Sequence, residues 1–321
     1  MESPSPVPAR QHRTFWWKEA LIMGGFYVVY SWSRNQFGSA TIAADGIPEQ
    51  AFNNAERLIR LERLIGLYHE ESVQDWFLGW HWFIRFWNTY YGTAHFIVTL
   101  GVFWLLFFKR PGVFPQWRNT LAATTALAIV GFSFFPVMPP RLLDAPCPSQ
   151  SETSYGGACI VSSLRDEGSD GLAGTDDDGT FGFVDTLPEY GGALWTFDSE
   201  TMQSISNQYA AMPSLHIGWS SWCAFAVWPL LRKRWTKVAV LAYPAATLFC
   251  IVVTGNHYWI DGVGGQITLG VGALLGWGLH RWNQNRLDER HAERHAERHA
   301  ERHNPASPER VSASGTDAPQ G

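Results

Sequence analysis

The sequence predicts an all-α fold: a polytopic membrane protein with a six-transmembrane-helix bundle and an interfacial amphipathic helix. The mean hydropathy of the 321 residues is slightly negative, at −0.12, but the apolar residues are concentrated in blocks that polar tails and one long acidic loop dilute. Tryptophan and phenylalanine are abundant, at 17 and 20 residues, as expected where aromatic side chains line a lipid–water interface. The basic residues are confined to particular loops, which indicates an orientation for the bundle.

Six segments are apolar enough to cross a bilayer, which takes about 20 residues each. They run approximately over residues 15–35, 90–108, 121–137, 215–231, 238–254 and 259–280. The first follows a polar, basic stretch and has no small-residue cleavage site after it, so we interpret it as a retained helix. The predicted organisation is a cytoplasmic N-terminal tail (1–14), a six-helix membrane domain (15–282) and a low-complexity cytoplasmic tail (283–321).

Basic residues predict the side of the membrane on which each loop lies, because positively charged loops stay cytoplasmic. Basic residues follow the second, fourth and sixth predicted spans: Lys109, Arg110 and Arg118; Arg232, Lys233, Arg234 and Lys237; and Arg281 and Arg286. Both termini are then cytoplasmic, and the acidic loop 138–212 is extracytoplasmic. This orientation brings three motifs to the outer side: Pro139-Pro140-Arg141, Pro213-Ser214-Leu215-His216 and His257-Tyr258-Trp259-Ile260-Asp261.

The connection 48–87, between the first two predicted spans, is expected to form outer interfacial helices. From Ala55 to Leu67, apolar residues recur at helical spacing and charges occupy the other face. Such a helix is typical of one that lies in the interface and packs over the bundle. A plain amphipathic connector is the simpler interpretation, and a role in gating substrate entry is the alternative.

The cysteines and the tail repeat have structural interpretations. Cys223 and Cys250 fall in predicted spans, as small apolar core residues do. Cys147 and Cys159 fall in the outer loop, where an oxidising compartment favours a disulfide. The tail repeats Glu289-Arg290-His291-Ala292 as far as His303, and its stacked histidines could bind a metal. Solvated low-complexity sequence is the simpler interpretation, because nothing buries the repeat.

The outer motifs contain the parts needed for phosphoryl transfer. His257 and Asp261 are four residues apart at a helix start, so their side chains share a face. The carboxylate can hold one imidazole nitrogen and leave the other free to attack. His216 and Ser214 lie near a helix N-terminus, where free N–H groups suit a phosphate, and the imidazole could protonate a leaving alkoxide. Arg141 adds a guanidinium, which binds phosphate oxygens in a bidentate manner.

The same residues allow other interpretations. A zinc site built from His216, His257 and Asp261 is the main rival chemistry, but it leaves Arg141 without a role. Each motif alone is compatible with a structural role, as an interfacial histidine, a helix-start pair or a helix terminator. Their joint occurrence on one face favours a functional site, because ionisable residues at membrane depth generally serve function.

The motifs resemble those of the type 2 phosphatidic acid phosphatase superfamily, and within it the inositol-phosphorylceramide-synthase-like (inositolphosphotransferase) branch. The second superfamily motif, Pro-Ser-x-His, occurs as residues 213–216, and the third, ending His-x-x-x-Asp, as residues 257–261 followed by Gly264-Gly265. Pro139-Pro140-Arg141 takes the place of the first motif. Tyr91-Gly92-Thr93-Ala94-His95 resembles a Tyr-x-x-x-His element of the synthase-like branch.

The resemblance implies metal-independent phosphoryl transfer without a cofactor, in which His257 is the nucleophile, Asp261 its partner and His216 the acid. The chain also departs from the superfamily pattern. The lysine of the first motif is absent, and Cys250 and Ile251 stand where a Ser-Arg pair is expected. The synthase-like branch tolerates both departures.

These departures leave Arg141, Ser214, His95 and Tyr258 to bind the substrate phosphate. His95 could equally be an intramembrane polar residue that bonds a neighbouring helix.

The predicted function is phosphoryl transfer on a lipid-linked phosphate at the outer leaflet of the cell membrane, through a phosphohistidine intermediate. Water or another hydroxyl would be the acceptor, so the enzyme would be a lipid phosphatase or a head-group phosphotransferase. Its expected partners are this substrate and membrane lipids, with no nucleic acid. The alternatives are a non-catalytic scaffold and a transporter or flippase that uses intramembrane His and Asp, although transporters usually contain internal repeats and none is evident here.

Overall fold

The computed structural model describes residues 49–145, 157–166, 179–191 and 208–303, with a few positions between 17 and 28. This part of the chain is helical apart from a β-bridge between Val137 and Ala210, in agreement with the predicted all-α class. The chain divides into two compact units, Met1–Trp277 and Gly278–Gly321. Most of the predicted first span, and Cys147 of the predicted disulfide, fall outside the described residues.

The predicted amphipathic helix is present as α3 (Glu49–Ile65), which begins earlier than expected and buries Phe52, Leu58 and Ile59. A second helix, α4 (Glu70–Leu78), follows it. Short helices lie in the segment 138–212: η1 (Pro140–Leu142), η2 (Gly157–Cys159), α7 (Ser163–Asp166) and α8 (Thr186–Tyr190). The position of α3 at a membrane interface stays a prediction.

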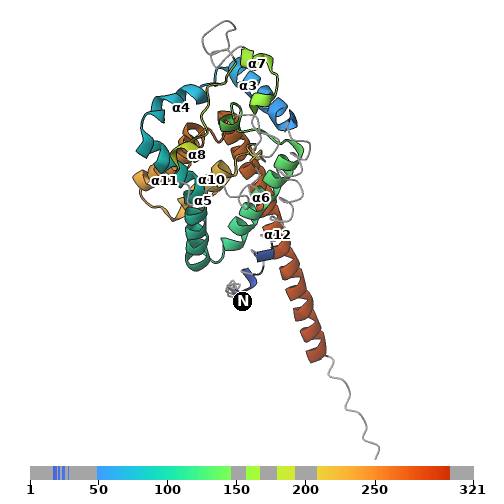
Figure 1. Ribbon diagram of the computed structural model, residues 1–321. Helices are drawn as coiled ribbons and strands as arrows, with labels where there is room; N and C mark the ends of the chain where they lie inside the picture. Colours follow the sequence, from blue (N-terminus) through green and yellow to red (C-terminus); the bar gives the residue numbers. More distant parts are fainter. Residues whose placement is uncertain are drawn as a thin grey trace, which may run out of the picture. The chain divides into compact units, whose positions relative to one another are not determined.

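Three helices of the described chain are long and apolar enough to cross a membrane (Figure 1): α5 (His81–Lys109), α11 (Arg234–Val253) and the stretch Trp259–Ala300 of α12 (Trp259–His303). The third and fourth predicted spans correspond to α6 (Phe114–Phe134) and α10 (Leu215–Val227). With 13 residues, α10 covers about 20 Å at 1.5 Å per residue. It is shorter than a hydrocarbon core of about 30 Å, so the count of six spans stays a prediction.

Helix α10 is the centre of the first unit, because it packs against α5, α6 and α11. Its Trp222 is fully buried and donates a hydrogen bond from Nε1 to the Trp117 carbonyl oxygen, at 2.9 Å. The buried Cys223 and Cys250 agree with their predicted core positions. Beyond α6, the Val137 N–H donates to the Tyr209 carbonyl at 2.8 Å, which joins the C-terminal end of α6 to the chain that enters α10.

The start of α12 packs closely on the start of α10, and Gly265 makes this approach possible. A Cβ atom at Gly265 would overlap the carbonyl oxygen of Ser214, whereas one at Gly270 would meet nothing. We therefore expect Gly265→Ala to destabilise the protein by about 1–3 kcal/mol through overpacking. Thermal unfolding of the detergent-purified variant would measure this, with Gly270→Ala as the matched control; equal midpoints for the two variants would contradict the close packing.

Candidate active site

His257 and Asp261 form a buried pair at the start of α12. The His257 Nδ1 atom lies 3.3 Å from Asp261 Oδ2 and 2.8 Å from the carbonyl oxygen of Ala211. Both oxygens are hydrogen-bond acceptors, so Nδ1 carries the ring proton and Nε2 keeps its lone pair. Asp261 Oδ2 also accepts a hydrogen bond from the Tyr258 N–H at 2.9 Å. With 0% exposure of Asp261 and 3% of His257, the pair is shielded from water.

A tight turn after α11 directs His257 toward Asp261. Gly255 adopts φ = 65°, a conformation that L side chains rarely adopt. The N–H groups of Asn256 and His257 both donate to the Ile251 carbonyl, at 3.0 and 3.1 Å. A side chain at Gly255 would also press on Gln74 and Arg141. The glycine therefore allows the chain to reverse direction immediately before the candidate nucleophile.

His216 lies across from His257, with ring centroids 5.7 Å apart and planes at 67°. Tyr91 stacks on the His216 ring at 4.3 Å and lies 6.4 Å from the His257 ring, and His95 contacts the His216 ring at 4.4 Å. These two residues belong to the Tyr-x-x-x-His element noted in the sequence. The backbone N–H of Ser214 donates to the Asp261 carbonyl at 3.0 Å, so the second and third motifs are joined directly.

Three buried polar atoms near these histidines have no hydrogen-bond partner among the described residues: His216 Nε2, Ser214 Oγ and Asp261 Oδ1. Buried polar groups in folded proteins are nearly always satisfied, and exceptions need an explanation. Two of the three belong to the Pro-Ser-x-His motif. A phosphate group could accept hydrogen bonds from Ser214 Oγ and from a protonated His216 Nε2, whereas Asp261 Oδ1 needs a donor.

Arg141 is attached to the turn that carries His257. Its backbone N–H donates to the Gly255 carbonyl at 2.8 Å, and its Nε donates to Asn256 Oδ1 at 3.0 Å. Its Nη1 donates to Asp185 Oδ2 at 2.7 Å. The arginine is 7% exposed, so it is a buried cation whose direction two side chains fix.

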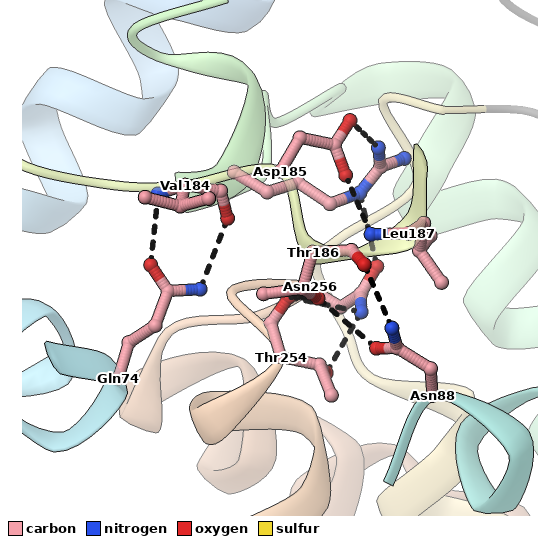
Figure 2. Close-up of polar contacts among 9 residues, drawn as sticks. Gln74, Asn88, Val184, Asp185, Thr186, Leu187, Thr254 and Asn256 are labelled. Carbon is pink, nitrogen blue, oxygen red and sulfur yellow. Dashed lines mark hydrogen bonds and ion pairs between the residues drawn. The ribbon is translucent and has the colours of Figure 1, made fainter. Parts of the chain in front are cut away.

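The segment 184–187 is held beside this arginine by side-chain amides (Figure 2). Gln74 accepts from the Val184 N–H at 2.9 Å and donates to the Val184 carbonyl at 3.1 Å. Asn88 donates to the Thr186 carbonyl at 2.8 Å and accepts from the Thr186 hydroxyl at 3.0 Å. Asp185 also accepts from the Leu187 N–H at 3.3 Å, which caps α8. These contacts make the segment part of the wall around Arg141.

A family model described as the PAP2 superfamily matches residues 56–275, which include Arg141, the Pro-Ser-x-His motif and the His257–Asp261 pair. The chain belongs to the PAP2 superfamily. The match confirms the resemblance seen in the motifs at the level of the superfamily. No curated protein and no solved structure matched the chain. Membership in the PAP2 superfamily indicates phosphatase or phosphotransferase activity, and the apolar helices indicate a membrane protein.

Two predicted ligands of this PAP2-superfamily site have other contacts. His95 Nδ1 lies 3.0 Å from the Tyr91 carbonyl, one turn earlier on α5, while its ring contacts His216. The Tyr258 hydroxyl donates to the Met138 carbonyl at 3.0 Å, and its ring packs in the cluster around Phe52. Phosphate binding by both residues stays a prediction. Among the described residues, no group of three or more His, Cys, Asp or Glu side chains could hold a metal ion.

The residues that position Arg141 in this PAP2-superfamily site were not predicted from the sequence: Gln74, Asn88, Asp185 and Asn256. Gln74 and Asn88 belong to no motif, and both are almost completely buried. Asp185 is one of many acidic residues in the segment 138–212. Only Asn256 carried a usable signal, because it immediately precedes the third-motif histidine.

Proposed function

We propose that this protein transfers a phosphoryl group from a lipid-linked phosphate through a phosphohistidine on His257, without a metal ion. One observation carries the proposal: His257 is held with its Nδ1 proton toward Asp261, and faces His216 at 5.7 Å beside buried polar atoms that lack partners. An in-line displacement needs an attacking atom and a proton donor on opposite sides of one phosphorus atom. Two imidazole rings at this separation suit that requirement.

The proposed reaction has two displacements. In the first, His257 Nε2 attacks phosphorus, an N–P bond forms, the lipid O–P bond breaks, and protonated His216 gives its proton to the leaving alkoxide. Asp261 stabilises the positive charge that develops on the His257 ring. In the second, a hydroxyl attacks phosphorus and gives its proton to His216 as the N–P bond breaks. This step frees His257 and restores the acid.

The charges around Arg141 support a head-group phosphotransferase of the inositol-phosphorylceramide-synthase-like branch. The usual lysine and second arginine are absent, and Asp185 already forms an ion pair with Arg141. A phosphodiester carries a single negative charge, whereas a phosphomonoester carries about −1.5 to −2 at neutral pH. A site with so little net positive charge fits the phosphodiester better. Burial of His257 and Asp261 also favours an alcohol over bulk water as the acceptor of the phosphoryl group.

The orientation of the site belongs to the same proposal. Basic residues in the connections after α5 and α10 support cytoplasmic placement of these helix ends. Ser214 lies at the opposite end of α10 and is hydrogen-bonded to Asp261 at the start of α12, so the phosphate would be bound at the outer leaflet of the cell membrane. A lipid can present its head group there while its acyl chains stay in the bilayer.

Isolation of the covalent intermediate tests this function. Detergent-purified protein is incubated with a lipid phosphodiester labelled on phosphorus, quenched in alkali and separated under denaturing conditions. We expect a label on the protein that withstands alkali, is lost in acid and disappears when an acceptor alcohol is added. Chelators should leave the rate of labelling unchanged. Turnover that proceeds without protein labelling and stops with a chelator would refute the proposal.

A further inference from the structure

Two buried glutamates are hydrogen-bonded to the first turn of α12, next to the candidate nucleophile His257. Glu62 lies on α3 and Glu70 is the first residue of α4, and both have 0% exposure. Carboxylates are almost never fully buried unless they are paired or hydrogen-bonded. The other charges of α3 occupy its outer face, so Glu62 breaks the amphipathic pattern of its own helix.

Both carboxyl groups accept hydrogen bonds from the backbone of α12. Glu62 Oε1 accepts from the Ile260 N–H at 2.8 Å, and Glu70 Oε1 accepts from the Trp259 N–H at 3.1 Å. Asp261 accepts from the Tyr258 N–H, so three acidic side chains satisfy three consecutive N–H groups. The first N–H groups of a helix have no partner within it, and the positive end of its dipole favours acids.

These carboxyl groups cannot all be ionised without strong repulsion. Burial, and then the neighbouring Glu70 carboxyl, raise the pKa of Glu62 to about 10. Asp261 adds to the same effect. The titratable groups that surround the pair are Asp261 and Tyr258 at the start of α12, and Tyr68 in the α3–α4 connection with Arg63 over its ring. Burial and the neighbouring carboxyl groups therefore favour the neutral form of Glu62.

We propose that Glu62 and Glu70 are positioning residues of the active site: two carboxyl groups through which α3 and α4 hold the first turn of α12, so that Asp261 stays aligned with His257. This inference rests on the proposed function for its kinetic readout, but not for its stability readout. It gives α3 a definite role, beyond that of a connector. The carboxyl group is needed as an acceptor for the backbone, and its proton is needed to avoid a third buried negative charge.

Substitutions at Glu62 separate positioning from simple packing. Glu62→Ala leaves the Ile260 N–H without its acceptor, so we expect kcat to fall by about 10- to 100-fold with little change in KM, as small misplacements of catalytic groups do. Glu62→Gln keeps the acceptor oxygen and mimics the neutral acid, so it should recover most of that loss. Glu49→Gln, at an exposed position of the same helix, is the matched control.

The pH dependence of unfolding tests, without any substrate, whether the folded protein holds a proton on Glu62. The pKa of Glu62 is higher in the folded state than the ordinary carboxyl value, so the folded protein binds the extra proton and loses stability as pH rises toward 10. The unfolding midpoint of the wild type should fall between pH 7 and pH 10, and that of Glu62→Gln should fall less.

Two results would overturn the pair: equal kcat for Glu62→Ala and Glu49→Gln, or equal pH slopes of the midpoint for wild type and Glu62→Gln. Protein that transfers no phosphoryl group from any lipid would refute the proposed function alone. In that case the midpoints would still decide whether Glu62 holds the proton.

Discussion

Replacing His257 with alanine is expected to lower turnover of the lipid phosphate by roughly 10³-fold or more, because the variant has no nucleophile for the first displacement. The His257 ring is buried and makes polar contacts through Nδ1 alone, to Ala211 and Asp261. Its removal therefore leaves the backbone of the turn in place. Initial rates on a labelled lipid phosphodiester would measure the effect, and protein labelling should disappear in parallel.

Controls separate chemistry from folding in this experiment. His291 lies on the exposed tail helix, so His291→Ala should keep the wild-type rate and labelling. The unfolding midpoint of His257→Ala should stay close to that of the wild type, and added imidazole should restore part of the lost rate by occupying the vacated space. A His257→Ala variant that still becomes labelled would assign the nucleophile to another residue.

Replacing Arg141 with lysine is expected to lower kcat/KM by about 10²- to 10³-fold, although the formal charge is kept. Lysine lacks the planar fork that holds Asn256 through Nε and Asp185 through Nη1 at the same time. An ammonium group would retain one of these contacts at most, and its direction would no longer be fixed. Arg85→Lys, at an exposed position on α5, is the matched control, and a loss of less than threefold for Arg141→Lys would contradict this role.

The partner of Arg141 gives a sharper test of substrate charge. Asp185→Asn removes the negative charge next to the guanidinium, so activity on a phosphomonoester lipid should rise relative to activity on a phosphodiester lipid. The change should vanish when it is made in the Arg141→Lys background, because the two side chains act through one contact. An unchanged ratio of the two activities in Asp185→Asn would show that this ion pair does not select the substrate.

The sequence was sufficient to predict the local geometry of the second and third motifs, because the spacing of residues along a helix determines which side chains lie on one face. His257 and Asp261 are one helical turn apart, and Ser214 and His216 begin a helix, so local structure alone determines how each pair lies. The position of Arg141 followed from the end of α6. The short length of α10 did not follow, because the apolar run continues through Trp228-Pro229-Leu230 after the α-helix has ended.

The supporting residues could not be predicted for a different reason. Glu62 falls on the apolar face of α3, where its spacing from Leu58 and Ile59 marks it as an exception, but only tertiary packing shows that its carboxyl group accepts from the Ile260 N–H. Gln74 and Asn88 bind a segment about a hundred positions away in the chain. No periodicity in one sequence encodes such a pairing, because a side-chain amide can bond any backbone that approaches it.

The hydrogen bonds between Gln74 and the backbone of Val184 affect which substitutions the segment 184–187 can accept. The amide holds main-chain atoms at that position and makes no use of the valine side chain. Val184 can therefore be replaced by another residue, for instance one that suits a different lipid, without loss of the two hydrogen bonds to Gln74. Variation in specificity could accumulate on the loop while the anchoring amide, on another helix, stays the same.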